Sequence, residues 1–445
     1  MLDVFMRRFF RDRRGNVAII FALSLIPIIF LTGMALDFTA AAQKRMILNA
    51  AADAAALAAV TPAMMTQSNS AAVTAATNIF NAEAAGVTGI TNLVLTIPTP
   101  NNSGLVRTVT VSYTASSVNS FPNVLALLTK TSETTWPISG SSTATSYSAP
   151  NINFYLLLDN SPSMDIAATT AGINTMVANT SAQGGCAFAC HESHPAADDL
   201  GNPGGEDNYT LAKNLGVVTR IENMATATSA LMSTASATEQ ANTATYAMAI
   251  YTFNDNGLNT IYAPSGKPSS NLTNAGTAAA GIDVLEVYSN NYLTSSNNNN
   301  DTDTNFETAM TAINTLMPNP GTGASNSTPQ EVLFIVSDGV DDEVNSSSCS
   351  QPLDGTRCQQ PFNTSMCTTV KNRGIMIAVL YTAYLPLPTN SWYNTWIAPF
   401  QSQISTNMQS CASPGLFFSV TTDGDITAAM QTLFQLAIAT ARLTQ

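Results

Sequence analysis

Three oxygen-bearing side chains follow one apolar stretch near the middle of the chain. Residues 154–158 are uninterruptedly apolar, and Asp159, Ser161 and Ser163 come directly after them. An unbroken apolar run that ends in a turn is typical of a strand buried on both faces, as in a parallel sheet. Mg²⁺ prefers oxygen ligands in octahedral array and usually keeps some water. One tight loop could therefore aim a carboxylate and two hydroxyls at a single cation.

Two later stretches could complete such a site. Thr304 directly precedes a helical pattern, and Asp338 ends a second apolar strand at residues 332–337. In open α/β sheets, ligands bind beyond the carboxyl ends of the strands. We therefore predict a site for Mg²⁺, or else Mn²⁺ or Ca²⁺, whose ligands are Asp159, Ser161, Ser163, Thr304 and Asp338.

The order of these motifs resembles the metal-ion-dependent adhesion site of von Willebrand factor type A domains. The motifs that carry the resemblance are Asp159-x-Ser161-x-Ser163, Thr304 and Ser337-Asp338-Gly339. The resemblance implies direct metal bonds from the two Ser and the Thr, and contacts through water from both Asp. It leaves the sixth position for the Asp or Glu carboxylate of a protein partner.

The fold class that this resemblance implies is α/β, a Rossmann-like domain with a mostly parallel sheet and helices on both faces. Strands and helices do alternate from residue 151 to residue 445, as βα units require. We expect insertions at about 165–217, 264–303 and 339–366. In the second of them, residues 301–305 imitate the start of a calcium loop, but they lack its Gly and its bidentate Glu, so a surface loop is the better interpretation.

The N-terminus has the pattern of a membrane anchor. Five Arg precede Gly15, and residues 17–36 then carry no charge. Twenty such residues can cross the hydrocarbon layer of about 30 Å as a helix. Because basic clusters stay on the cytoplasmic side, we expect a single-pass cell-membrane protein with a periplasmic or extracytoplasmic C-terminal domain. A signal peptide cleaved near residues 40–42 is the alternative, although the apolar run is longer than usual for one.

Residues 13–23, and more specifically the Asn49-Ala-Ala-Ala-Asp53-Ala-Ala-Ala-Leu57 motif, resemble the N-terminal segment of TadG-like proteins of Tad (tight adherence) pilus assembly. The resemblance implies other pilus-assembly components as partners. Related pseudopilins carry a Glu five residues after the processing Gly, whereas this chain has Ile20 there. We therefore expect no cleavage after Gly15.

Between anchor and C-terminal domain, alternating apolar and polar residues predict antiparallel strands at 93–97, 106–113 and 143–147. We interpret residues 37–150 as a pilin-like helix and a small α+β module that acts as a spacer. The predicted domain plan is thus 1–36, 37–150 and 151–445.

Charge excludes one class of function. The net charge is −13, and seven of the 16 Lys and Arg lie within the first 45 residues. The rest of the chain therefore cannot offer the clustered cations that nucleic acid requires. Neither a Gly-x-Ser-x-Gly elbow nor a Gly-x-x-x-x-Gly-Lys phosphate loop occurs, so we expect no enzyme.

Six cysteines follow the anchor on its outward side, where disulfides persist. These disulfide candidates are Cys186, Cys190, Cys349, Cys358, Cys367 and Cys411. The order of the strands favours a pair between Cys367 and Cys411, and the other four close two short loops. Cys186 and Cys190 could instead bind zinc with His191 and His194. A haem attachment motif would need one residue fewer between the two cysteines.

The sequence thus predicts a membrane-anchored protein of Tad/Flp pilus assembly or anchoring that binds a protein partner through a metal site. A metal-dependent adhesin unconnected with pili is the first alternative. A metal-assisted hydrolase, in which the cation activates water, is a weaker one.

Overall fold

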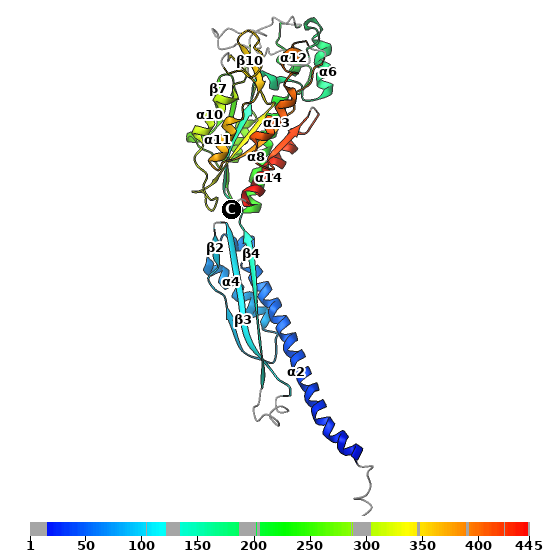
Figure 1. Cartoon of the computed structure of the whole chain (residues 1–445). Coiled ribbons are helices and arrows are strands. Elements are labelled where there is room, and N and C mark those ends of the chain that lie inside the picture. Colours follow the sequence, from blue (N-terminus) through cyan, green and yellow to red (C-terminus); the bar gives the residue numbers. More distant parts are fainter. Residues whose placement is uncertain are drawn as a thin grey trace, which may run out of the picture. The chain divides into compact units, whose positions relative to one another are not determined.

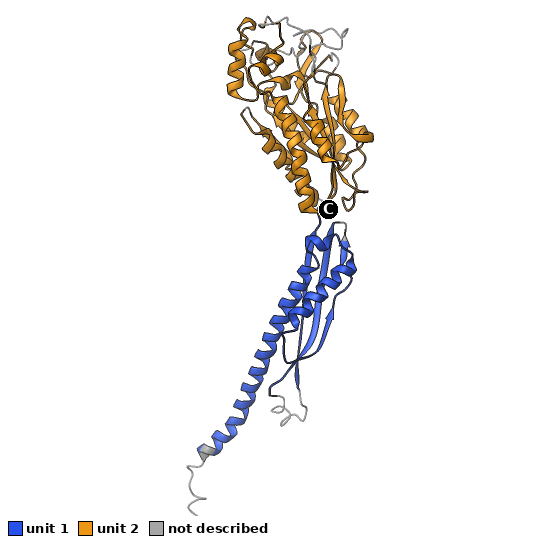
Figure 2. Cartoon of the chain, turned by 180° about the vertical axis from the view of Figure 1, so that it is seen from behind, with its two compact units in different colours: residues 1–148 blue, residues 149–445 orange. Residues whose placement is uncertain are grey.

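The computed structural model describes residues 16–103, 105–121, 134–186, 202, 205–285, 287, 304–344, 348–388, 391–421 and 423–443. The chain divides into two compact units, residues 1–148 (unit 1) and 149–445 (unit 2) (Figure 2). The Arg cluster before Gly15 lies outside the described residues.

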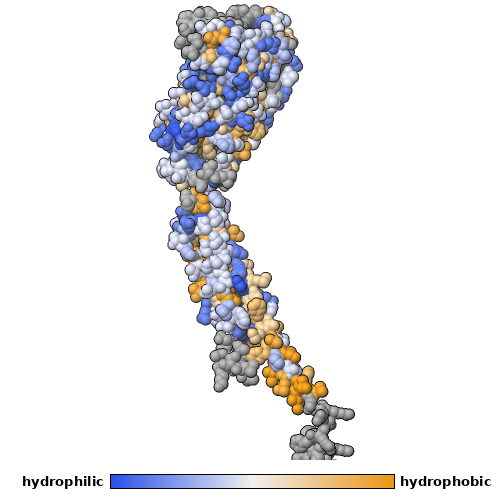
Figure 3. Space-filling view, viewed as in Figure 1, coloured by the Kyte–Doolittle hydropathy of each residue, from blue (hydrophilic) through white to orange (hydrophobic). Residues whose placement is uncertain are grey.

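Unit 1 begins with one long helix, α2 (Asn16–Ala58). Its first half is long and apolar enough to cross a membrane, judged by length and composition. Apolar side chains there have no cover: Val17 is 74 % and Ile20 is 66 % exposed. This half projects past the ends of strands β3 (Val106–Val118) and β4 (Thr135–Tyr147), and Figure 3 shows its apolar surface. Helix α2 continues without a break into the Ala-rich stretch.

The second half of α2 packs on an antiparallel sheet. Strand β3 pairs with β4, β1 (Ile90–Thr96) and β2 (Asn101–Ser103). Helices α3 (Pro62–Met65) and α4 (Asn69–Ala84) complete the unit. The core includes five buried alanines of α2 and its extension, which let the backbones approach closely: Ala51, Ala52, Ala55, Ala56 and Ala59.

Asn49, the first residue of the Asn-Ala-Ala-Ala-Asp motif, has a structural role in this packing. Its Oδ1 accepts a hydrogen bond from the Tyr113 hydroxyl at 2.8 Å. A Cβ at Gly140 would lie 2.1 Å from the same Oδ1. A side chain at residue 140 would therefore have to displace the hydrogen-bonded side chains of Asn49 and Tyr113.

Unit 2 is built on a six-stranded sheet in the order β12-β11-β8-β5-β6-β7. All neighbours are parallel except β6 and β7, which are antiparallel. Counted along the chain the order is 3-2-1-4-5-6, an order known from doubly wound α/β sheets. The strands are β5 (Ile152–Asp159), β6 (Tyr246–Asn254), β7 (Gly257–Tyr262), β8 (Gln330–Ser337), β11 (Met376–Thr382) and β12 (Phe417–Val420).

Helices cover both faces of this sheet, and each face has its own apolar core (Figure 1). One core holds side chains of α8 (Arg220–Asn242), α9 (Leu272–Ala279) and α14 (Ile426–Leu443). The other core holds α10 (Phe306–Leu316), α11 (Ser365–Asn372), α12 (Ser391–Trp396) and α13 (Gln401–Cys411). The prediction of a largely parallel sheet is therefore confirmed, with the last helix where its apolar pattern placed it.

The predicted insertions contain structure of their own. The first holds α6 (Thr170–Asn179) and α7 (Asn208–Asn214). The third forms an antiparallel pair of strands, β9 (Val340–Val344) and β10 (Arg357–Pro361). In the second, residues 288–303 lie outside the described part, but Asn305 caps α10 by accepting a hydrogen bond from the Thr308 N–H at 2.9 Å.

Disulfides form as the sequence indicated. Cys367 of α11 is bonded to Cys411 of α13, which confirms the predicted pair, and Cys349 is bonded to Cys358. Cys186 also belongs to a disulfide. Cys190, His191 and His194 lie outside the described residues.

Candidate metal centre

The centre of the site is the turn that follows β5. Asp159 Oδ1 accepts hydrogen bonds from the Ser161 N–H at 3.0 Å and from the Ser161 hydroxyl at 2.6 Å. The Ser161 and Ser163 hydroxyl oxygens are 3.0 Å apart. Ser337, at the end of the adjacent strand β8, donates to Asp159 Oδ2 at 2.6 Å. The structure therefore brings the three predicted ligands of the first motif together in one buried cluster.

Asp338 lies next to this cluster because β8 pairs with β5 in parallel. Its side chain is buried. Burial raises the pKa of Asp159 to about 7, and the negative charge of Asp338 is the second cause. Hydrogen bonds from Ser161 and Ser337 oppose this rise. Two buried carboxylates that disfavour each other's charge are a natural position for a proton or a cation.

Thr304 is positioned by the β9–β10 hairpin. Its N–H and carbonyl group each form a hydrogen bond of 2.9 Å with the backbone of Asp342 in β9. The Asp342 carboxylate in turn accepts two hydrogen bonds from the buried Arg357 of β10, at 2.6 and 2.5 Å. Thr304 is buried, and its place depends on this ion pair.

Asp341 is a carboxylate at this site that sequence reasoning missed. Its Oδ1 accepts a hydrogen bond from the Phe306 N–H at 2.9 Å, two residues after Thr304. Burial raises its pKa well above the usual range, and Glu343 and Asp159 add to the rise. Asp341 therefore links the start of α10 to the neighbourhood of Asp159. The available signal was the run of three acidic residues, 341–343, shortly after Asp338-Gly339, which the sequence analysis assigned to an insertion.

Arg220, the first residue of α8, was missed as well. It is buried and donates from Nη2 to the Ala383 carbonyl at 2.7 Å. Burial lowers its pKa, whereas the nearby negative charge of Asp338 raises it. Arg220 therefore offsets part of the negative charge of Asp338 when both groups are ionised.

The donor set fits a hard cation and no other kind. It consists of hydroxyl and carboxylate oxygens, which suit Mg²⁺, Mn²⁺ and Ca²⁺, and it offers no imidazole or thiolate for softer metals. Within the described part of the chain, no group of three or more His, Cys, Asp or Glu side chains is arranged to hold a metal. A cation here would therefore need the hydroxyls of Ser161, Ser163 and Thr304 in addition to carboxylates.

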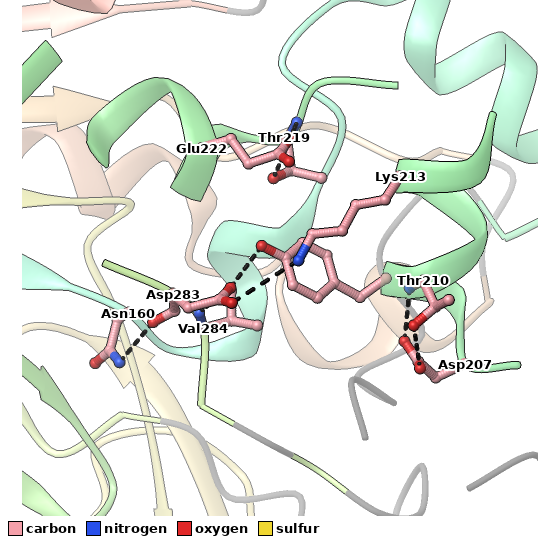
Figure 4. Close-up of polar contacts among 9 residues, drawn as sticks. Asn160, Asp207, Thr210, Lys213, Thr219, Glu222, Asp283 and Val284 are labelled. Atoms are coloured by element: carbon pink, nitrogen blue, oxygen red, sulfur yellow. Dashed lines mark hydrogen bonds and ion pairs between the residues drawn. The ribbon is translucent and has the colours of Figure 1, made fainter. Parts of the chain in front are cut away.

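A second polar network supports the turn from the side of the first insertion (Figure 4). Asn160 donates to the Asp283 carbonyl at 3.0 Å, and the Tyr209 hydroxyl of α7 donates to Asp283 Oδ1 at 2.6 Å. Lys213 forms an ion pair with the same carboxylate at 3.8 Å. Asp165, buried next to these charges, has a pKa raised well above its usual range, first by burial. The first insertion is thus linked through Asp283 to the turn that follows β5.

Comparison with known proteins adds a likeness at the other end of the chain. Residues 15–67 match the family model described as "Tad: Putative Flp pilus-assembly TadE/G-like". No curated protein matches the chain. The solved structure of the PilB minor pilin from Streptococcus sanguinis is 12 % identical, with a TM-score of 0.31 over 79 % of this chain and 78 % of that one, too low a score to support any argument. Residues 15–67 of this chain are thus similar to TadE/G-like proteins of Flp pilus assembly.

Proposed function

We propose that the chain is a membrane-anchored, extracytoplasmic protein of Tad/Flp pilus assembly or anchoring. The observation that carries this proposal is the TadE/G-like segment at residues 15–67, which includes the apolar half of α2. The N-terminus would lie in the cytoplasm, because the Arg cluster precedes the apolar stretch. Its partners would be other pilus components, and its role would be binding rather than catalysis.

We further propose that unit 2 is a von Willebrand type A domain that binds its partner through a metal ion. The strand order and the position of Asp159 and Asp338 support this. Strands β5 and β8 are neighbours in the middle of the sheet, at the point where the strand order reverses. Ligands bind beyond the carboxyl ends of the strands at such points. Asp159, Ser161, Ser163, Thr304 and Asp338 would hold Mg²⁺, Mn²⁺ or Ca²⁺, and a partner's carboxylate would complete the coordination.

A first test measures metal-linked stability of the full chain in detergent. At 100 times its dissociation constant, Mg²⁺ or Mn²⁺ should raise the free energy of unfolding by about 2.7 kcal/mol. Asp159→Asn should abolish the gain, and Glu307→Gln should preserve it, because Glu307 is an exposed carboxylate on the helix next to Thr304. The gain should shrink as the pH falls below 7, since protons then compete with the cation for Asp159. Absence of any shift with divalent ions in the parent chain would refute the metal site.

A second test addresses pili in the source bacterium. Deleting the gene should abolish surface pili in electron micrographs, and the parent chain should restore them. The Asp159→Asn chain should reach the membrane in normal amount and fail to restore pilus-dependent attachment, whereas Glu307→Gln should succeed. Normal pili in the deletion strain would exclude a role in pilus assembly. Full rescue by the Asp159→Asn chain would show that the role in pilus assembly does not require the metal site.

A further inference from the structure

Helix α2 leaves the sheet of unit 1 at Asp37, the first charged residue after the apolar stretch 17–36. The Asp37 side chain is only 7 % exposed. Its Oδ1 accepts a hydrogen bond from the Ser120 N–H at 2.7 Å, and its Oδ2 accepts one from the Phe121 N–H at 3.2 Å. A carboxylate at the end of the apolar stretch thus ties down the chain just beyond the end of β3.

The ring of Phe121 reaches further along the helix. A Cβ at Gly33 would lie 3.3 Å from the Phe121 Cβ and Cγ, so Phe121 packs against the α2 backbone one turn before Asp37. Gly33 belongs to the uncharged stretch. Phe121 is nevertheless 43 % exposed, so α2 covers only part of its ring.

Two more aromatic side chains lie close to this level. The Phe38 ring meets the Trp136 ring of β4 edge to face, with centroids 5.8 Å apart. Phe38 is 58 % exposed, and Trp136 is partly buried. We call Phe38, Phe121 and Trp136 the aromatic collar. It comes from α2, from the segment after β3 and from β4, and it lies along positions 33–38 of α2, about 7.5 Å of helix axis.

The collar coincides with the expected edge of a bilayer. Twenty helical residues rise about 30 Å, the thickness of the hydrocarbon layer, so a helix that spans with residues 17–36 has Asp37 at the boundary. Trp and Tyr are favoured in the headgroup region, where an apolar ring and a polar edge are both satisfied, and Trp136 is the member of the collar that has both. Unpaired backbone N–H groups are costly in the adjoining hydrocarbon layer, and Asp37 satisfies those of Ser120 and Phe121.

We propose that the β3–β4 end of unit 1 rests in the headgroup region of the membrane, with the aromatic collar as its lipid contact and Asp37 as the clamp that holds it to the helix. The occupant of the surface is lipid rather than another protein, because the exposed rings of Phe38 and Phe121 lie at the end of the exposed apolar stretch of α2. The inference rests on the proposed membrane anchoring. It adds a second attachment, by which unit 1 contacts the bilayer directly.

The test reads the depth of Trp136 in vesicles of phosphatidylcholine and phosphatidylglycerol. In the full chain, Trp392→Phe and Trp396→Phe leave Trp136 as the only tryptophan, and lipids brominated near the headgroup or near the chain ends serve as quenchers. We expect Trp136 to be quenched at least twofold more by shallow than by deep bromine. A chain that keeps only Trp392 measures the quenching of a tryptophan in unit 2 for comparison.

Flotation of the vesicles separates the possible failures. A chain that does not float with the vesicles overturns the anchor itself. If the chain floats but Trp136 is no more quenched than Trp392, the anchor is supported and the lipid contact is overturned. The lipid contact is also overturned if a second protein shields Trp136 from the lipid.

The clamp has a matched pair of variants. Asp37→Ala should reduce Trp136 quenching at least twofold, because the end of β3 is no longer held at the membrane boundary. Asp53→Ala removes an exposed carboxylate from the same helix and should leave quenching unchanged. Equal quenching in Asp37→Ala and the parent chain would remove Asp37 from the proposal, and circular dichroism checks that both variants keep their fold.

Discussion

Arg357→Met is expected to lower the free energy of unfolding of unit 2 by about 3–5 kcal/mol. The side chain of Arg357 is 1 % and that of Asp342 is 8 % exposed, and the two share two short hydrogen bonds. Met matches the length of the Arg stem but leaves the Asp342 carboxylate buried without its main partner, which is the costly way to break such a pair. Urea denaturation followed by circular dichroism, in EDTA, measures the loss without any contribution from metal.

The same variant should weaken metal binding, because the backbone of Asp342 positions Thr304. Adding Asp342→Leu to Arg357→Met removes the orphaned charge and should recover much of the stability. Lys267→Met is the matched control: it removes an exposed cation from unit 2 and should change stability by no more than about 0.5 kcal/mol. A loss below about 1 kcal/mol for Arg357→Met would show that the pair does not hold the hairpin.

Removing the disulfide between α11 and α13, with Cys367→Ala and Cys411→Ala, is expected to destabilise unit 2 by about 4 kcal/mol. The bond closes a loop with a sequence separation of 44, and the loop-closure entropy of the unfolded chain sets this magnitude. Helices α11 and α13 contribute to the same apolar core, so the double substitution also removes a covalent link between two helices of that core.

The second disulfide supplies the control for this experiment. Cys349→Ala with Cys358→Ala opens a loop with a sequence separation of only 9, for which the same relation gives about 2.6 kcal/mol. Urea midpoints without reductant should therefore fall further for the longer loop. The opposite order would mean that native contacts of the β9–β10 hairpin, rather than chain entropy, dominate.

The central strands of the unit 2 sheet could be predicted because they are apolar on both faces. Strands β5 and β8 are buried almost throughout, and each contains an unbroken apolar run, residues 154–158 and 332–336, that is followed by Asp159 or by Ser337-Asp338. The polar turn after each run marked the candidate ligands. Because β5 and β8 are parallel neighbours, Asp159 and Asp338 then had to lie close together at the carboxyl ends of the strands.

The β9–β10 hairpin could not be predicted in the same way. Its strands read Val-Asp-Asp-Glu-Val and Arg-Cys-Gln-Gln-Pro, which carry no apolar alternation. They are buried because Arg357 neutralises Asp342 and a disulfide ends at Cys358. Strands that are buried through paired charges show no alternation of apolar and polar residues in their sequence. The sequence analysis therefore assigned this region to an insertion, and Asp341 was missed with it.

Helix α2 has a mechanical consequence. Its 43 residues extend about 65 Å, and no loop separates the apolar half from the half that packs on the sheet. A force applied to the β3–β4 sheet is therefore transmitted to the apolar half through the continuous helix, which has no loop about which the two halves could rotate. Pro27 lies inside the apolar half, and if the part of the helix after Pro27 leans by some angle, the sheet of unit 1 must lean by the same angle. A flexible joint in that position would absorb such a load, whereas this helix transmits it.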